Sequence, residues 1–151
     1  MPTLVQMSNA HEFPFGFFVD MTRWPDEIVA LGDEDVAVHV GFFRHRLDVV
    51  IEHDQVYIDP DGHMWEVKQG QCYNGASVPR IFWRLITPFS PGIRDAAAFH
   101  DVYCVSQMYS QADTHRLFWR IQRANRVNKY LAFVTWICVV TYCRFRYWSW
   151  K

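Results

Sequence analysis

Several classes of protein are excluded by what this sequence has little of. Its 151 residues include only 7 Gly and 7 Pro and no low-complexity run, which excludes a collagen-like or disordered chain. Its 4 cysteines contain no C-x-x-C pair, so a zinc knuckle is not expected, and buried free thiols are. The formal net charge of −1 provides no overall field to attract nucleic acid, so no nucleic-acid partner is expected.

Signals for export and for membrane insertion are also scarce. Residues 1–10 lack a basic segment followed by an apolar run, so we expect no signal peptide. The apolar segment 130–143 is shorter than the ~18–20 residues that span a bilayer, and a core helix is expected there. The segment 144–151 mixes Arg with Trp and Tyr, a composition typical of membrane and protein interfaces.

Hydrophobic residues are abundant, and they predict a single packed domain over residues 1–151. They make up 50% of the chain, and aromatics make up 17%. We expect an α+β fold, in which a small antiparallel sheet precedes a helical hairpin and one further apolar helix. The expected parts are an irregular arm (1–35), a β-rich part (36–72), a small-residue loop with a short helix (73–92) and a helical part with an aromatic-basic tail (93–151).

Local patterns place the individual elements. Alternating apolar residues predict strands, and Asp61-Gly62 predicts a hairpin turn between two of them, because Gly supplies the positive φ that such turns need. Ser110 is a candidate N-cap. The expected strands are 36–42, 47–51, 56–58 and 64–67, and the expected helices are 81–86, 93–107, 111–124 and 129–143.

The stretch from Asp95 to Tyr103, followed by Asp113, carries the chemistry. It places His100 beside Asp101 on a predicted helix, and a further aspartate opens the next helix. A histidine that takes up a proton, a carboxylate that orients it and another that holds a cation are the parts of a hydrolytic site. The same residues are also suited to a buried polar network that only fixes the fold.

Two segments resemble an uncharacterised family of bacteriophages and prophages, the domain of unknown function 1353. The segment Tyr73-Asn74-Gly75-Ala76-Ser77-Val78-Pro79-Arg80-Ile81-Phe82-Trp83 resembles the family pattern F-x-T-D-G-A-S-x-P-R-x-x-W. Ala96-Ala97-Ala98-Phe99-His100-Asp101 and Ala112-Asp113 resemble its A-A-x-x-H-D…A-D pattern. The resemblance extends over about 73–143 and implies a phage or prophage protein, made in the host cytoplasm and, in one alternative, associated with the virion.

The sequence departs from that pattern at two positions. Asn74 stands where the family has Asp, and an amide oxygen brings no charge to a cation. Cys104 stands where the family has an aromatic residue, and Tyr103 lies one position earlier, about 100° away on a helix.

The same stretch also resembles, more distantly, the His-Asp helix of phospholipase A2 enzymes. That resemblance implies that His100 is the general base, that Asp101 binds Ca²⁺ and that Asp113 accepts a hydrogen bond from His100. Asn74 would offer a further oxygen to the Ca²⁺, although no counterpart of the glycine-rich calcium loop is found. The supporting residues are Asp95, Tyr103, Gly75, Ser77 and Arg80.

Three functions are compatible with these patterns. One is a metal-assisted hydrolase acting on a lipid or cell-envelope ester. Another is a non-catalytic phage structural or accessory protein, in which His100, Asp101 and Asp113 hold helices together. The aromatic ends Phe13–Phe18 and Phe145–Trp150 would then dock on other phage proteins. The third is an accessory protein that uses the last helix at a lipid or membrane surface.

Overall fold

The computed structural model describes residues 13–31, 40–42, 48–51, 53–74 and 91–150. In these ranges, short antiparallel strands come first and three helices follow, so the predicted α+β class is confirmed. The loop and short helix predicted over 75–90, with Gly75, Ser77 and Arg80, lie outside the described residues.

The predicted hairpin is formed by β4 (Gln55–Ile58) and β5 (Met64–Val67). Gly62 in its turn has a φ of 81°, as the Asp-Gly pair predicted. Asp59 stabilises the turn, because its Oδ1 accepts hydrogen bonds from the backbone N–H groups of Asp61 and His63, both at 2.9 Å. The turn is therefore closed by its own side chain.

The hairpin continues beyond a bend into β3 (Asp48–Ile51) and β6 (Cys72–Asn74). The register is unbroken: Val50 pairs with Cys72, and Gln55, five residues later, pairs with Val67, which lies five residues before Cys72. At the bend, Gly70 has a φ of 81° and donates its N–H to the carbonyl of Ile51 at 2.8 Å. The bend divides the expected single sheet into two.

Each half of the bent hairpin gains one edge strand. β1 (Phe17–Phe18) pairs with β4, and β2 (Val40–Phe42) pairs with β3, which gives sheet orders β1-β4-β5 and β2-β3-β6. Phe18 is buried against Tyr57 and Phe99, with ring centroids 5.4 and 5.7 Å away. This part of the predicted N-terminal aromatic end therefore covers its own sheet.

The three helices are α2 (Pro91–Ser106), α3 (Gln111–Ala124) and α4 (Lys129–Arg146). The Ser110 cap is confirmed, because its Oγ accepts from the backbone N–H of Asp113 at 3.1 Å. Asn128 caps α4 in the same way, accepting from the N–H of Tyr130 at 2.9 Å. In the described part of the chain, no helix has the length and apolar character needed to cross a membrane.

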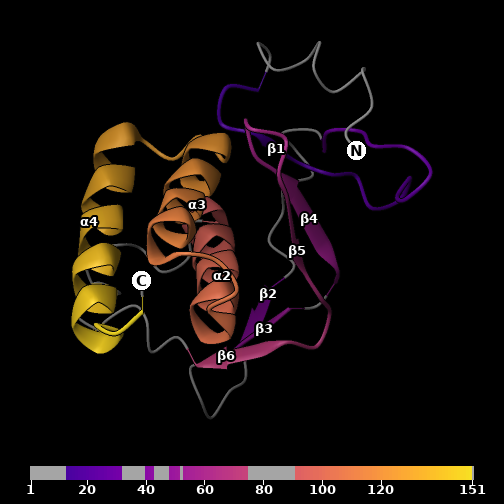
Figure 1. Ribbon diagram of the computed structural model, residues 1–151. Coiled ribbons are helices and arrows are strands. Elements are labelled where there is room, and N and C mark those ends of the chain that lie inside the picture. The colour runs from indigo at the N-terminus through magenta and orange to yellow at the C-terminus, as the bar shows by residue number, and fades with distance from the viewer. Residues whose placement is uncertain (1–12, 32–39, 43–47, 52, 75–90, 151) are drawn as a thin grey trace.

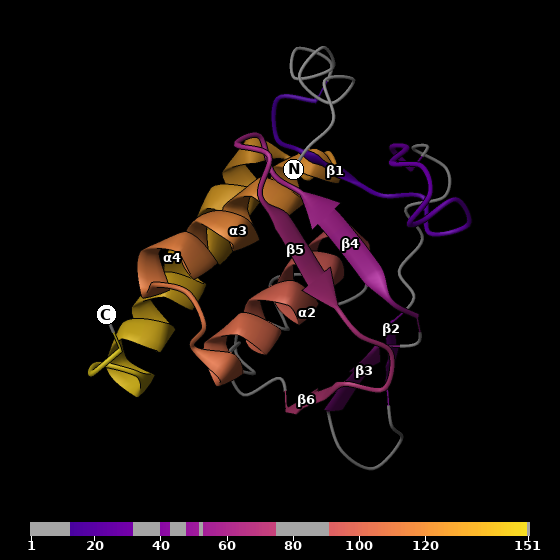
Figure 2. The same ribbon diagram turned by 45° about the vertical axis from the view of Figure 1, so that its right-hand side comes forward.

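The helices form a layer beside the strands (Figure 1). α2 contacts the strands through Phe99, which is fully buried and lies edge-on to Tyr57 at 6.4 Å. α3 packs on α2, and α4 packs on α3 at the side of the layer away from the strands (Figures 1 and 2). One face of α4 is thus left without a neighbour among the described elements.

Candidate functional site

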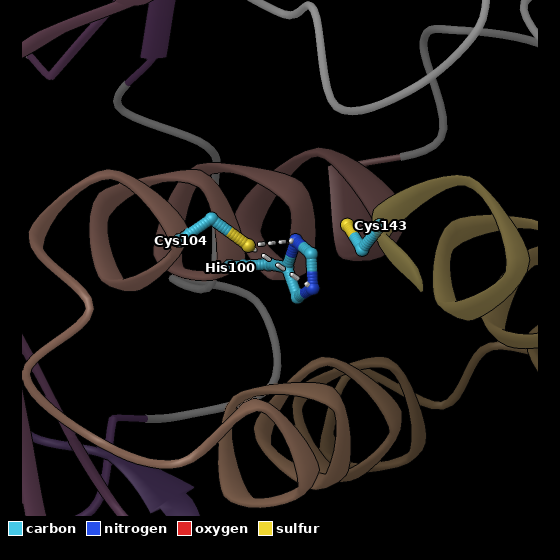
Figure 3. A group of neighbouring side chains, drawn as sticks. All are labelled: His100, Cys104 and Cys143. Carbon is cyan, nitrogen blue, oxygen red and sulfur yellow. Dashed lines mark hydrogen bonds between the residues drawn. The ribbon is translucent and has the colours of Figure 1, made fainter. Parts of the chain in front are cut away.

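His100 lies in a closed cluster between the helices rather than at an open surface. His100 and Cys104 are four residues apart on α2 and share a face, and their exposed fractions are 1% and 0%. The Sγ of Cys104 lies 3.4 Å from Nδ1 of His100 and 3.6 Å from its Nε2. The sulfur of Cys143 approaches the same imidazole from α4, as Figure 3 shows. The ligand atoms of these three residues all lie within 4.8 Å of one another.

The second imidazole of the cluster belongs to His115 on α3. Its Nδ1 lies 2.9 Å from Nε2 of His100, and the two rings are stacked with centroids 5.2 Å apart. One of these nitrogens donates and the other accepts, which requires an acceptor nitrogen that carries no proton. Burial, with smaller contributions from His100 and Arg144, lowers the pKa of His115 to about 3. His115 is therefore neutral at pH 7.

The thiol of Cys104 is also held in its neutral form. A hydrogen bond with Cys143, followed by burial, raises the pKa of the Cys104 thiol above its ordinary value of 9.0. Cys104 and Cys143 are both buried and unbridged, as the composition predicted, whereas Cys138 is half-buried. A nucleophilic thiolate is not favoured in these surroundings.

Asp101 accompanies His100 into the interior. Its exposed fraction is 3%, and its Oδ1 lies 3.9 Å from Nδ1 of His100, which is too far for a hydrogen bond. Within the described residues, this oxygen has no hydrogen-bond partner. The pair is therefore brought together without the close contact that a working His-Asp dyad would make.

Asp113 lies away from the imidazole for which it was predicted as a partner. Its Oδ2 accepts a hydrogen bond from Oγ of Ser110 at 2.7 Å, and its Oδ1 lies 3.2 Å from Arg116. No hydrogen bond between described residues joins it to His100. Asp113 and His115 are two positions apart on α3, so they point in directions about 200° apart. His115, rather than Asp113, faces α2.

Asp113 instead lines an open cleft of about 230 Å³ between α3 and the hairpin turn. In this cleft Arg120 forms ion pairs with two carboxylates, with Nη1 at 3.3 Å from Asp59 and 2.8 Å from Asp61. Asp59 also accepts a hydrogen bond from the indole N–H of Trp65 at 3.0 Å. These contacts hold the β4–β5 turn against α3.

Two of the predicted supporting residues make structural contacts. The hydroxyl of Tyr103 donates to the carbonyl of Glu66 at 2.8 Å and accepts from its N–H at 3.0 Å, which fixes α2 to β5. Asp95 accepts from Nδ2 of Asn125 at 3.2 Å, which fixes α2 to the end of α3. Burial, opposed by this hydrogen bond and by Arg94, raises the pKa of Asp95 to about 7.

The predicted oxygen ligands of a calcium ion stay a prediction. The backbone of Asn74 ends β6 and pairs with Asp48. The other loop residues proposed around it, Gly75, Ser77 and Arg80, lie outside the part of the chain that the structure describes.

Sequence reasoning missed His115 and Cys143. A signal for His115 exists, because it precedes Phe118 by three residues and Gln122 by seven, the spacing of one buried helix face. No comparable signal marks Cys143, because nearly every residue of the segment 130–143 is apolar and no face stands out.

Fold and site together define an α+β domain whose helical layer encloses a buried cluster of imidazoles and thiols. The chain belongs to a family described as "Protein of unknown function (DUF1353)", whose model matches residues 49–139 and confirms the resemblance. It is similar to the uncharacterised proteins y4jT and y4iH of Sinorhizobium fredii, with 37% and 29% identity over 90 residues, 59% of this chain in each case. Those residues cover 27% and 36% of the relatives, so the chain spans about a third of their length or less. No solved structure matches.

Proposed function

We propose that this chain is a non-catalytic assembly protein of a phage or prophage, which associates with further copies of itself through α4. The resemblance of its motifs to phage and prophage proteins supports the origin. The burial of His100 and Asp101, with Asp113 on another side of α3, supports a structural role for the predicted triad.

One observation carries the proposal: α4 is apolar on both of its sides. Its inner side is buried at Ala132, Thr135, Val139 and Cys143. A helix that is apolar all round is ordinarily covered all round, and an uncovered apolar patch marks an interaction site. The large exposed side chains are Tyr130 (70%), Leu131 (37%), Phe133 (50%), Val134 (52%) and Ile137 (44%), followed by Phe145 (81%) and Trp148 (84%).

The distribution of charge on this outer face favours a second copy as its occupant. The middle of the face, around Phe133 and Ile137, carries no charge, and the basic residues of α4 stand only near its ends, at Lys129, Arg144 and Arg146. Two helices that cross at their middles at the common angle of about 50° bury the apolar centre and carry their basic ends apart. The net charge of −1 leaves little repulsion between whole copies.

Sedimentation velocity on the full chain tests the proposal. We expect the wild type to form a dimer or larger assembly, and Ile137→Glu to be monomeric with an unchanged circular-dichroism spectrum. Met64→Glu is the matched control, because Met64 is 40% exposed but lies on β5, across the molecule from α4. A wild type that is monomeric up to its solubility limit contradicts the proposal. If that monomer also floats with anionic phospholipid vesicles, the outer face of α4 binds a membrane surface instead of a second copy.

A second candidate is the metal-assisted hydrolase acting on a lipid or envelope ester. The observation in its favour is that His100 and Asp101 lie together, with Oδ1 of Asp101 available to a cation. Incubation of the full chain with phospholipid and short-chain ester substrates, with and without Ca²⁺, tests it. Turnover that is lost in His100→Ala would establish this candidate and overturn the non-catalytic role.

A further inference from the structure

We propose that His100, Cys104 and Cys143 bind one thiophilic divalent metal ion of the zinc class, held between α2 and α4. This inference does not depend on self-association, since all three side chains are buried inside one copy. It differs from the predicted calcium site in its ligands, which are nitrogen and sulfur rather than oxygen.

The ligand atoms already have nearly the spacing that such an ion requires. In a tetrahedral zinc site, bonds of about 2.0 Å to nitrogen and 2.3 Å to sulfur place those two ligand atoms about 3.5 Å apart. Nδ1 of His100 and Sγ of Cys104 are 3.4 Å apart, and the sulfur of Cys143 completes a group within 4.8 Å. Sγ of Cys104 also lies 3.6 Å from Nε2 and therefore sits over the ring face, so the side chains of the group (Figure 3) must rotate for one ion to meet Nδ1 and both sulfurs.

One nitrogen of the His100 imidazole already has the kind of hydrogen bond that a metal-ligating histidine usually makes. A ligating histidine commonly forms a hydrogen bond through its other nitrogen, which fixes the tautomer and the ring plane. Here Nε2 of His100 is bonded to Nδ1 of His115 at 2.9 Å. With the proton of that bond on Nε2 of His100, the lone pair of Nδ1 is left for the ion.

The unpartnered carboxylate oxygen beside the cluster is a second, independent observation. Oδ1 of Asp101 is buried, lies 3.9 Å from Nδ1 of His100 and has no hydrogen-bond partner among the described residues. A buried carboxylate oxygen that lacks a hydrogen bond is costly. A bound dication would supply the missing charge, and this oxygen is a donor for its fourth coordination position.

Metal binding would give α4 a direct link to α2, in addition to its packing on α3. Both thiols must lose a proton when the ion binds, so two protons pass to solvent and the binding free energy adds to folding stability. Cys143 lies beyond residues 49–139, the part matched by the family model, and Cys104 stands where the family pattern has an aromatic residue. The family model therefore does not cover all three ligands.

Cobalt titration of the reduced, metal-free full chain tests the site without any activity assay. We expect one equivalent of Co²⁺ to produce a thiolate-to-cobalt charge-transfer band and the visible bands of a tetrahedral ion, and Zn²⁺ to displace it. Cys104→Ser and Cys143→Ser should each lose most of the charge-transfer intensity. Cys138→Ser is the control, because this half-buried thiol is on the same helix but outside the cluster, and it should behave as the wild type.

A second readout keeps the test decisive if a variant fails to fold. In the wild type, one equivalent of Zn²⁺ should protect two of the 4 cysteines from a thiol reagent and raise the melting temperature. The proposal is overturned if the folded wild type gives no cobalt band and no protection, or if the band persists at full intensity in both cluster variants. The proposal would also be overturned if the protein is isolated with a Cys104–Cys143 disulfide and still binds no metal after that disulfide is reduced.

Discussion

α3 carries two polar clusters on different sides. One is buried and hydrogen-bonded, and the other is open to solvent and held by ion pairs. Towards α2 and α4, His115 makes a hydrogen bond with His100, which lies with the two thiols in a buried cluster. Towards the hairpin turn, Asp113 and Arg120 line an open cleft in which carboxylates and guanidinium groups pair. Hydrogen bonding between imidazoles holds the interior cluster together, whereas ion pairs at an open surface hold the cleft together.

The difference in solvent exposure explains why the predicted triad is divided, with His100 and Asp101 in the interior and Asp113 at the cleft. An ionised aspartate at the start of a helix is stabilised by its capping serine, by the backbone N–H groups there and by solvent. Moving Asp113 beside His100 would require it to leave all three for a dry site. The imidazole of His115 can remain neutral in that site, so it is the better partner there.

The largest expected effect comes from removing the centre of the interior cluster. His100→Ala leaves a cavity and an unpartnered nitrogen on His115, so we expect a loss of about 3 kcal/mol of unfolding free energy. Urea denaturation of the reduced protein measures it. A variant as stable as the wild type would show that the cluster does not hold the helices together.

Breaking the charged cleft should cost less and should respond to salt. Arg120→Ala leaves Asp59 with its three other hydrogen bonds, from Trp65 and two backbone N–H groups, so we expect a loss of about 2 kcal/mol. This loss should shrink in high salt, whereas that of His100→Ala should not. Urea denaturation at low and high salt measures the stability losses of both variants. Equal salt dependence of the two losses would contradict the difference between the two clusters.

Asp95 provides a pH-dependent test of a buried acid outside both clusters. Its pKa in the folded protein, about 7, is above the ordinary value of 3.8, so the stability it contributes is present below pH 3.8 and is lost as the pH rises towards 7. Asp95→Asn removes that loss and keeps an oxygen for Asn125. Its stability relative to the wild type should therefore rise across this window, by up to about 1.4 kcal/mol per pH unit. A pH-independent difference would mean that Asp95 is ionised in the fold.

The smallest expected effect is that of Asp113→Ala. It removes a helix-capping contact and an exposed ion pair with Arg116, so we expect a loss of about 1 kcal/mol or less. Thermal melting measures it, and Arg116→Ala serves as a control for the ion pair alone. A loss as large as that of His100→Ala would connect Asp113 to the interior cluster.

Local signals predicted the parts of the molecule that local physics determines. The Asp-Gly turn, the Ser110 cap and the three helices follow from backbone preferences within a few residues, and the structure confirms them. The division of the sheet depends on a bend at Gly70, which carries no distinctive sequence pattern. The pairing of His100 with His115 depends on how α3 is rotated against α2, and the spacing within either helix does not set that rotation.

The pairing of the two imidazoles is the central claim, and nitrogen NMR of the full chain tests it most directly. A coupling across the hydrogen bond between Nε2 of His100 and Nδ1 of His115 should be observed, and it should persist in Asp113→Ala. The absence of that coupling, together with imidazole signals of His100 that change when Asp113 is removed, would contradict the account and restore the predicted triad.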